Sequence, residues 1–222
     1  VDVGACFDGD ADRCMFVDEK GNTIGCDILT AVIAKDFLKQ PQNKGSAIVY
    51  DLRSSHVVLD EIKAAGGVPK RERVGHSFMK KTLAESNAVF GGELSGHFYF
   101  RDNFNADSGA IAFARVLSIL SQTRGTLSDL IAPFKTYSHS GEINFEVEDK
   151  DGKIRELASA YGKGQIDYLD GITVDMGDWW FNVRKSNTEP MLRLNLEAKT
   201  PELLKEKYNE LQGRLGHPAE GH

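Results

Sequence analysis

The sequence lacks any long apolar run. No window approaches ~18 consecutive apolar residues, so no segment is predicted to span a membrane. It also lacks a long run of Lys or Arg, and its formal net charge is -6, which argues against a nucleic-acid partner. The three cysteines, Cys6, Cys14 and Cys26, lack Cys-x-x-Cys spacing, which argues against a zinc site or a disulfide framework. We therefore expect reduced thiols in a cytoplasmic protein without membrane or nucleic-acid partners.

The composition is otherwise ordinary for a folded protein. Of the 222 residues, 41% are hydrophobic and 27% are charged, and the mean hydropathy is -0.35. These values exclude disorder, fibre and coiled coil as dominant classes, and the length suits one large domain or two smaller ones. Because the chain starts at Val1 without Met and reaches a group of acidic residues almost at once, we expect it to be a fragment of a longer protein.

The first half of the sequence alternates strand-like and helix-like segments. Short apolar runs predict strands, and apolar residues at helical spacing predict helices. The predicted strands are 3–7, 13–17, 47–50, 68–71 and 88–91, and the predicted helices are 27–38, 57–65, 78–85 and 108–122. From residue 47 onward this order is typical of βαβ units around a mostly parallel sheet.

The second half has a different character. The predicted strands are 141–148, 165–169, 171–176, 179–184 and 191–198, and the predicted helices are 153–161 and 201–215. Thr200 and Pro201 suit the N-cap and the first position of the last helix. The predicted fold class is therefore α/β: a mixed, mostly parallel α/β/α sandwich domain, followed by a small α+β domain with an antiparallel sheet and flanking helices. We place the boundary near residues 125–138.

Asp8, Asp10 and Asp12 alternate in the loop after the first predicted strand. Alternate side chains can converge, and three carboxylates that lie close together repel one another unless a cation lies between them. Oxygen ligands of this kind suit Mg²⁺, Ca²⁺ or Mn²⁺. A solvated acidic turn explains the same spacing without a metal. A calcium-binding EF-hand loop is disfavoured, because Arg13 occupies the sixth position, where that loop requires glycine.

Two further polar loops follow predicted strands. The segment GGELSGH at 91–97 places a carboxylate, a hydroxyl and an imidazole between glycines, and these groups can hydrogen-bond a polyol. The segment RKSNTEP at 184–190 combines two cations, two hydroxyls and an amide, which suit a phosphate. Taken singly, each could be a polar turn. Arg53 and His76 also follow predicted strands, and for each of them a structural role is the simpler interpretation. Ser77 could cap the next helix.

Read together, the segments FDGDADR at 7–13, GGELSGH at 91–97 and RKSNTEP at 184–190 resemble the α-D-phosphohexomutase family, specifically the bacterial phosphomannomutases/phosphoglucomutases. The likeness runs from residue 1 to about residue 212, and segments 51–55 and 74–77 look like further family landmarks. It implies a four-domain protein. Residues 1–25 would end the second, metal-loop domain, 26–130 would form the third domain with the sugar-binding loop, and 131–222 the fourth domain with the phosphate-binding loop.

The resemblance also implies an activity and a role for each site residue. Asp8, Asp10 and Asp12 would bind Mg²⁺, and Arg13 would lie beside a phosphoserine. The proton-transfer candidates would be His97 and His76, and the substrate-binding residues would be Arg53, Glu93, Ser95, Arg184, Ser186, Asn187 and Thr188. The implied reaction interconverts hexose 6-phosphate and hexose 1-phosphate through phosphoserine and a hexose 1,6-bisphosphate. Mannose, glucose and glucosamine phosphates are all compatible with the sequence.

Two departures from the family pattern qualify this expectation. The family's phosphorylated serine belongs to a first domain that has no counterpart in these residues, so we expect N-terminal domains to be missing and the chain alone to be inactive. Arg53 stands where many relatives have Lys, and because Arg stays protonated, His97 is the better candidate for proton transfer. The alternative function is a non-catalytic module that binds sugar phosphates.

Overall fold

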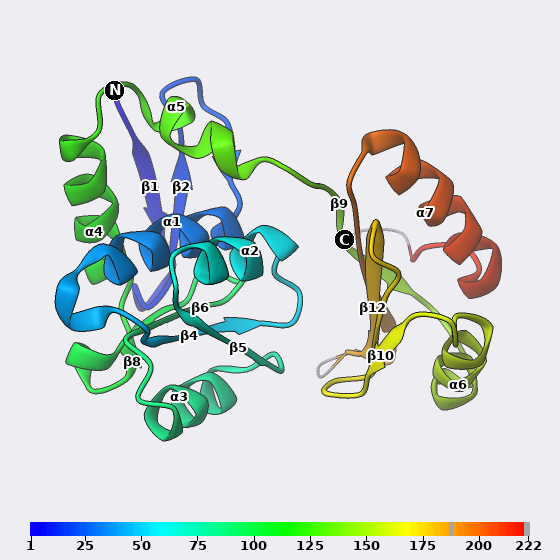
Figure 1. Ribbon diagram of the computed structural model, residues 1–222. Coiled ribbons are helices and arrows are strands. Elements are labelled where there is room, and N and C mark those ends of the chain that lie inside the picture. Colours follow the sequence, from blue (N-terminus) through cyan, green and yellow to red (C-terminus); the bar gives the residue numbers. More distant parts are fainter. Residues whose placement is uncertain (187–188, 220–222) are drawn as a thin grey trace. The chain divides into compact units, whose positions relative to one another are not determined.

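The computed structural model describes residues 1–186 and 189–219. The chain divides into two compact units, Val1–Thr136 and Tyr137–His222, each with its own strands and helices (Figure 1). Within the described residues, no helix has the length and apolar character needed to cross a bilayer.

Unit 1 is built on a five-stranded sheet with the order β5-β4-β6-β7-β8. Its strands are β4 (Ala47–Asp51), β5 (Val68–Glu72), β6 (Phe90–Gly92), β7 (Phe98–Phe100) and β8 (Ala106–Asp107). Strand β4 pairs in parallel with β5 and β6, whereas β6–β7 and β7–β8 are antiparallel. The predicted mixed α/β class is confirmed, with the parallel pairings around β4 and the antiparallel ones toward the β8 edge.

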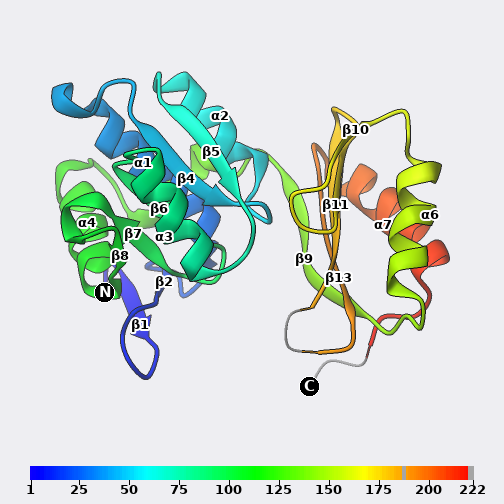
Figure 2. The same cartoon turned by 90° about the horizontal axis from the view of Figure 1, so that it is seen from below.

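Helices cover both faces of this sheet. Helices α1 (Cys26–Lys39) and α2 (His56–Ala64) lie on one face, and α3 (His76–Glu85) lies on the other (Figures 1 and 2). Successive side chains of a strand point to opposite faces, so the sheet packs against helices on both sides. Val49 packs with Met79 of α3 on one face. Phe90 stacks on Phe37 of α1 on the other, with ring centroids 5.5 Å apart. The unit is completed by α4 (Gly109–Gln122), α5 (Leu127–Ile131) and short 3-10 helices at Pro41–Asn43, Arg101–Asn103 and Ala132–Phe134.

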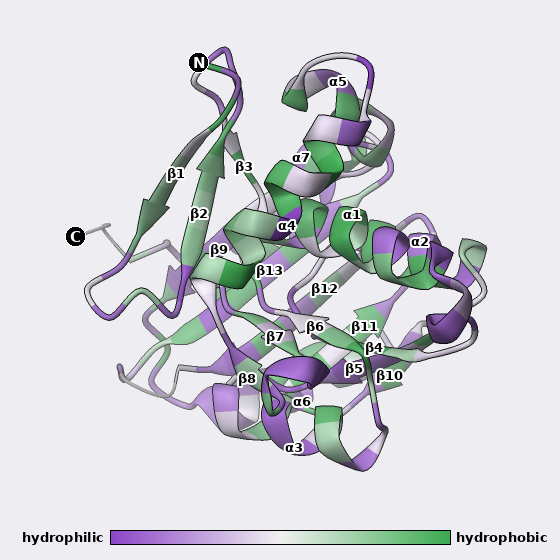
Figure 3. Cartoon of the chain, turned by 90° about the vertical axis from the view of Figure 1, so that its left-hand side faces the viewer, coloured by the Kyte–Doolittle hydropathy of each residue, from purple (hydrophilic) through white to green (hydrophobic). Residues whose placement is uncertain are grey.

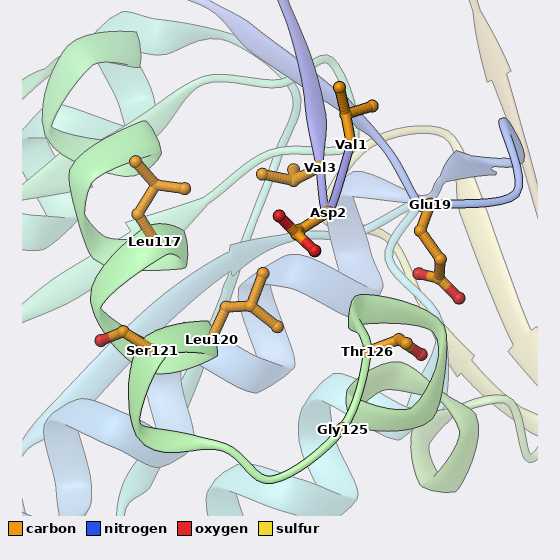
Figure 4. A pocket seen from close by; sticks show the side chains of 9 residues that line it. All are labelled: Val1, Asp2, Val3, Glu19, Leu117, Leu120, Ser121, Gly125 and Thr126. Atoms are coloured by element: carbon orange, nitrogen blue, oxygen red, sulfur yellow. The ribbon is translucent and has the colours of Figure 1, made fainter.

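A small antiparallel sheet begins unit 1. It consists of β1 (Gly4–Phe7), β2 (Cys14–Val17) and β3 (Thr23–Ile24), and β1 and β2 are hydrophobic along their length (Figure 3). Phe7 and Phe16 both contact Phe113 of α4 through their rings. The first residue of α4, Gly109, packs against the β1–β2 loop so closely that a Cβ there would lie 2.7 Å from the carbonyl oxygen of Arg13.

Unit 2 is an antiparallel sheet covered on one face by two helices (Figure 2). The strand order is β10-β11-β12-β13-β9, formed by Gln165–Asp167, Ile172–Asp175, Trp179–Lys185, Leu192–Ala198 and Ser138–Phe145, and the helices are α6 (Lys150–Ala160) and α7 (Pro201–Leu215). Side chains alternate along β12. Phe181 and Val183 join the hydrophobic core with Leu157 of α6 and Leu211 of α7. Arg184, next in sequence, therefore lies on the opposite face of the sheet.

The elements that sequence analysis missed are short. Strands β7 and β8 have three and two residues, and β3 has two, too few for a period-two pattern to emerge. The suggestion that Ser77 caps a helix is wrong, because Gly75 holds the N-cap position and α3 begins at His76. Gly75 has a φ of 133°, a conformation that L side chains rarely adopt, and its N–H donates to Glu93 Oε1 at 3.1 Å.

One buried carboxylate joins the loops that follow β4 and β6. Asp51 is fully buried at the end of β4. It accepts hydrogen bonds from the N–H of Arg53 at 2.8 Å, the guanidinium of Arg53 at 2.7 Å and the N–H of Leu94 at 2.8 Å. Because a buried charge is costly unless it is paired and hydrogen-bonded, these three donors fix both loops to one point.

The contact at Gly109 generates a stability prediction. Gly109→Ala is expected to lower the free energy of unfolding of unit 1 by about 1–3 kcal/mol, because the new methyl group meets backbone atoms of the β1–β2 loop. Gly213→Ala in α7 is the control, since nothing lies within 4 Å of a Cβ at that position, and it should stabilise unit 2 by about 0.5 kcal/mol. Urea unfolding followed by far-UV circular dichroism measures both; equal effects of the two variants would contradict the tight contact.

The hydrogen bonds of Asp51 generate a second stability prediction. Asp51→Asn is expected to destabilise unit 1 by about 3–5 kcal/mol, because it leaves the Arg53 guanidinium buried without this carboxylate. Glu85→Gln breaks the pair with Lys81, whose two side chains are 65% and 70% exposed, and should cost less than about 0.5 kcal/mol. The same unfolding measurement compares them, and a cost of Asp51→Asn no larger than that of Glu85→Gln would show that Asp51 does not hold the loops.

Candidate functional site

The β1–β2 loop brings three carboxylates together. One oxygen each from Asp8, Asp10 and Asp12 lies within 4.8 Å of the other two. Ala11 allows the tight turn by adopting a φ of 60°. Arg13 donates from Nε to Asp8 Oδ2 at 2.7 Å, and this bond holds the pKa of Asp8 below its usual value. The same bond raises the pKa of Arg13, so both groups stay charged and part of the negative charge in the loop is balanced.

The loop after β6 carries a buried acid. The side chain of Glu93 is 2% exposed and accepts a hydrogen bond of 2.6 Å from the hydroxyl of Tyr99. Burial, followed by the charge of Glu93, raises the pKa of Tyr99, so its hydroxyl remains a donor. Ser95 Oγ lies 2.9 Å from His97 Nδ1 and orients the imidazole. The predicted sugar-binding side chains therefore already have fixed positions within unit 1.

These two loops meet through their backbones. The N–H of Cys14 donates to the carbonyl of Gly96 at 3.2 Å, and Arg13 and His97 form an isolated antiparallel bridge. As a result, His97 Nε2 lies 3.5 Å from Asp12 Oδ2. The structure thus brings together the predicted metal loop and the predicted sugar loop, in which Asp12 and His97 are 85 residues apart in the sequence.

Arg53 and His76 are placed beside the same loop by separate contacts. Asp51 binds both Arg53 and the N–H of Leu94, the residue that follows Glu93. His76 is exposed at the start of α3, and Glu93 accepts a hydrogen bond from its neighbour Gly75. The loops that carry Arg53, His76 and the GGELSGH segment are therefore connected by the carboxylates of Asp51 and Glu93.

The predicted phosphate loop belongs to unit 2. Arg184, near the end of β12, is 1% exposed and donates to Glu142 Oε2 at 2.7 Å, and Arg193 donates to the other oxygen of Glu142 at 3.0 Å. The Ser186 hydroxyl accepts from the N–H of Glu189 at 3.2 Å. Asn187 and Thr188, also predicted for this loop, lie outside the described residues. Within the described part of unit 2, one carboxylate orients two guanidinium groups.

Sequence reasoning missed the residues that hold the predicted ones. Asp51 begins the segment 51–55 that the sequence singled out, but its role was not assigned, although its place at the carboxyl end of a predicted strand, where sites of this fold gather, could have indicated one. Asp107 Oδ2 lies 3.9 Å from His97 Nε2. The other oxygen, Asp107 Oδ1, forms an ion pair with Lys80 Nζ at 2.8 Å. Neither Asp107 nor Lys80 stands in a local pattern that separates it from an ordinary surface charge.

Comparison with known proteins gives two family matches. Residues 26–137 match "Phosphoglucomutase/phosphomannomutase, alpha/beta/alpha domain III", and residues 142–211 match the "Phosphoglucomutase/phosphomannomutase, C-terminal domain". A phosphomannomutase from Methanocaldococcus jannaschii is 44% identical over 214 residues, which cover 96% of this chain and 47% of that protein. The chain spans about half the length of the curated relatives it matches.

Solved structures show the same architecture. A phosphoglucomutase/phosphomannomutase family protein from Burkholderia thailandensis superposes with a TM-score of 0.87 at 29% identity, covering 97% of this chain and 46% of that one. An Aspergillus fumigatus N-acetylphosphoglucosamine mutase, solved with GlcNAc-6P and magnesium, shares the fold with a TM-score of 0.70 at 15% identity, covering 95% of this chain and 51% of that one. The chain therefore belongs to the phosphoglucomutase/phosphomannomutase family, of which it contains domain III and the C-terminal domain.

Proposed function

We propose that this chain is the C-terminal part of a phosphomannomutase/phosphoglucomutase that interconverts hexose 6-phosphate and hexose 1-phosphate. The observation that carries the proposal is the junction of Arg13 with His97, which sets the carboxylate loop against the GGELSGH loop. The phosphoryl donor would be a phosphoserine in N-terminal domains of the same protein, and a hexose 1,6-bisphosphate would be the intermediate. Mannose or glucose phosphates are the proposed substrates.

The proposed domain assignment keeps residues 1–25 as the end of a second domain, 26–130 as the third and 131–222 as the fourth. The family matches at 26–137 and 142–211 support the last two, with a boundary a few residues later than 130. The three-stranded sheet of β1, β2 and β3 supports the first, since it is separate from the sheet of β4 to β8. The cytoplasmic location stays a prediction.

Asp8, Asp10 and Asp12 fit a magnesium ion. Their oxygens lie within 4.8 Å of one another, and oxygen donors are the ligands that Mg²⁺ prefers. A bound Mg²⁺ would neutralise charge on the phosphoryl group in transfer. The neighbouring Arg13, held by Asp8, supplies a fixed positive charge on the same loop for a phosphate oxygen.

The loop after β6 would bind the sugar and move its proton. Glu93 and Ser95 are the proposed partners of the sugar hydroxyls. Because Ser95 holds Nδ1 of His97, Nε2 is the nitrogen that would exchange a proton with the reacting hydroxyl. His76 is the second candidate for this role. Arg53, which stays protonated and is fixed by Asp51, would bind substrate without exchanging a proton.

The loop after β12 would hold the phosphate that does not react. Arg184 is oriented by Glu142, and Ser186 adds a hydroxyl. Asn187 and Thr188 complete the proposed set but lie outside the described residues. Phosphoryl transfer depends mainly on positioning and charge stabilisation, so a preset guanidinium suits this task.

The proposed metal site predicts selective loss of magnesium binding. The chain is expected to bind one Mg²⁺, and Asp10→Asn should weaken binding at least about tenfold because it removes one of three charged ligands. Asp102→Asn, which changes an 83% exposed carboxylate of the same unit, should bind like the parent chain. Calorimetric titration with MgCl₂ measures both; equal loss in the two variants would mean that binding is nonspecific.

The proposed activity predicts binding without turnover. The 222-residue chain is expected to bind mannose 6-phosphate but not to form mannose 1-phosphate, because its residues include no family serine loop. Arg184→Ala should raise the Kd about 10–100-fold, the worth of a charge-assisted hydrogen bond, whereas Arg155→Ala on the exposed face of α6 should not.

Calorimetry gives the affinities, a coupled mutase assay gives the turnover, and circular dichroism shows whether the Arg184→Ala variant is folded. Turnover by the isolated chain would refute the placement of the nucleophile in another domain. Equal affinities of the two variants would refute the role of Arg184.

A further inference from the structure

We propose that Asp12, His97 and Asp107 form a second metal site, which binds a transition-metal ion such as Zn²⁺ and shares Asp12 with the proposed magnesium site. One ligand atom from each of the three lies within 4.8 Å of the others. The site is built entirely within unit 1, from the β1–β2 loop, the loop after β6 and strand β8. The three zinc ligands are argued without the proposed function, whereas the sharing of Asp12 rests on the proposed magnesium site.

The distances suit a zinc ion. His97 Nε2 lies 3.5 Å from Asp12 Oδ2 and 3.9 Å from Asp107 Oδ2. Zinc binds nitrogen and carboxylate oxygen at about 2.0–2.2 Å, which places two ligands of a tetrahedral site roughly 3.4 Å apart. The observed separations exceed that value slightly, so a small inward movement of two side chains would complete the geometry.

The ligands also have the outer partners that a metal site needs. A metal-binding imidazole generally donates its other ring nitrogen to an oxygen group, which fixes the ring orientation. Here His97 Nδ1 lies 2.9 Å from Ser95 Oγ and 3.5 Å from Glu93 Oε2. The second oxygen of Asp107 is held by Lys80 at 2.8 Å. Two of the three ligands are therefore oriented by residues outside the cluster.

The donor set favours zinc over magnesium. An imidazole with two carboxylates suits Zn²⁺, whereas Mg²⁺ prefers oxygen ligands in octahedral geometry. The side chain of Asp12 is 39% exposed and that of His97 is 19% exposed, which leaves room for water at a fourth position. This site uses no cysteine, so the cysteine spacing gave no sign of it. Burial raises the pKa of Cys14 to about 11 and that of Cys26 to about 12, which keeps both thiols protonated and weak as ligands.

Sharing Asp12 makes the two ions competitors. A zinc ion at this site would take the lone pair of His97 Nε2 and one carboxylate of the Asp8, Asp10 and Asp12 group. The chain would therefore bind magnesium more weakly when zinc is present, and binding linkage requires that magnesium weaken zinc to the same extent.

The test uses the 222-residue chain, freed of metal with a chelator and titrated with ZnCl₂ by calorimetry. Wild type should bind one Zn²⁺ at this site. His97→Ala and Asp107→Asn should each weaken that binding by more than about 100-fold, because even outer-shell changes cost about 10–100-fold. Asp10→Asn, which removes only a proposed magnesium ligand, should retain zinc affinity within about threefold. Added MgCl₂ should raise the apparent Kd for zinc.

Three results would overturn the proposal. Loss of zinc binding in Asp10→Asn but not in His97→Ala or Asp107→Asn would place the ion among the three loop aspartates. Titration with Co²⁺ that yields a sulfur-to-cobalt charge-transfer band would place it on cysteine. Simultaneous binding of both ions without mutual effect would refute the sharing of Asp12. Circular dichroism verifies folding, and Asp107→Asn decides the outcome if His97→Ala unfolds.

Discussion

The fully buried carboxylate of Asp51 sits where the parallel pairings of unit 1 end, and donors from two loops converge on it. Its oxygens receive the main chain and the guanidinium of Arg53 and the N–H of Leu94. Because the charge of Asp51 is buried, losing any of these hydrogen bonds would be costly. The bonds therefore fix the two loops relative to one another as well as to β4. Glu93 adds a second connection, to Gly75 before α3. The arrangement of Arg53, His76 and His97 follows from these two acids.

Much of this architecture could be predicted from residue patterns. The apolar strand 47–50 and the helical spacing after it indicated a parallel α/β sheet, and the strand-like segments between residues 141 and 198 indicated the antiparallel sheet of unit 2. The antiparallel edge could not be predicted, because Phe98–Phe100 is apolar without alternation and Ala106–Asp107 is too short. Such strands form because neighbouring backbone groups require partners, and a local sequence pattern does not record that requirement.

The candidate site likewise contains residues that the sequence could identify and residues that it could not. The sequence identified side chains that lie in motifs, such as Asp8, Glu93 and His97, because their types and spacing carry chemistry. It could not identify Glu142 or Asp107, since no local motif records their contacts: Glu142 binds Arg184, which is 42 residues away, and Asp107 approaches His97 across the β7–β8 turn. An isolated acid in a strand resembles a solvated surface group until the fold supplies its partner. Orientation of site residues is therefore a tertiary property, whereas their chemistry is a local one.

The close fit of Gly109 has an electrostatic meaning as well as a steric one. The first turn of α4 lies against the carbonyl groups of Ala11 and Arg13, so the partially positive end of this helix adjoins the loop that carries the three aspartates. That field offsets part of the repulsion among the carboxylates before any ion arrives. The loop can then hold its shape when empty, and a cation that enters it needs little rearrangement of the protein.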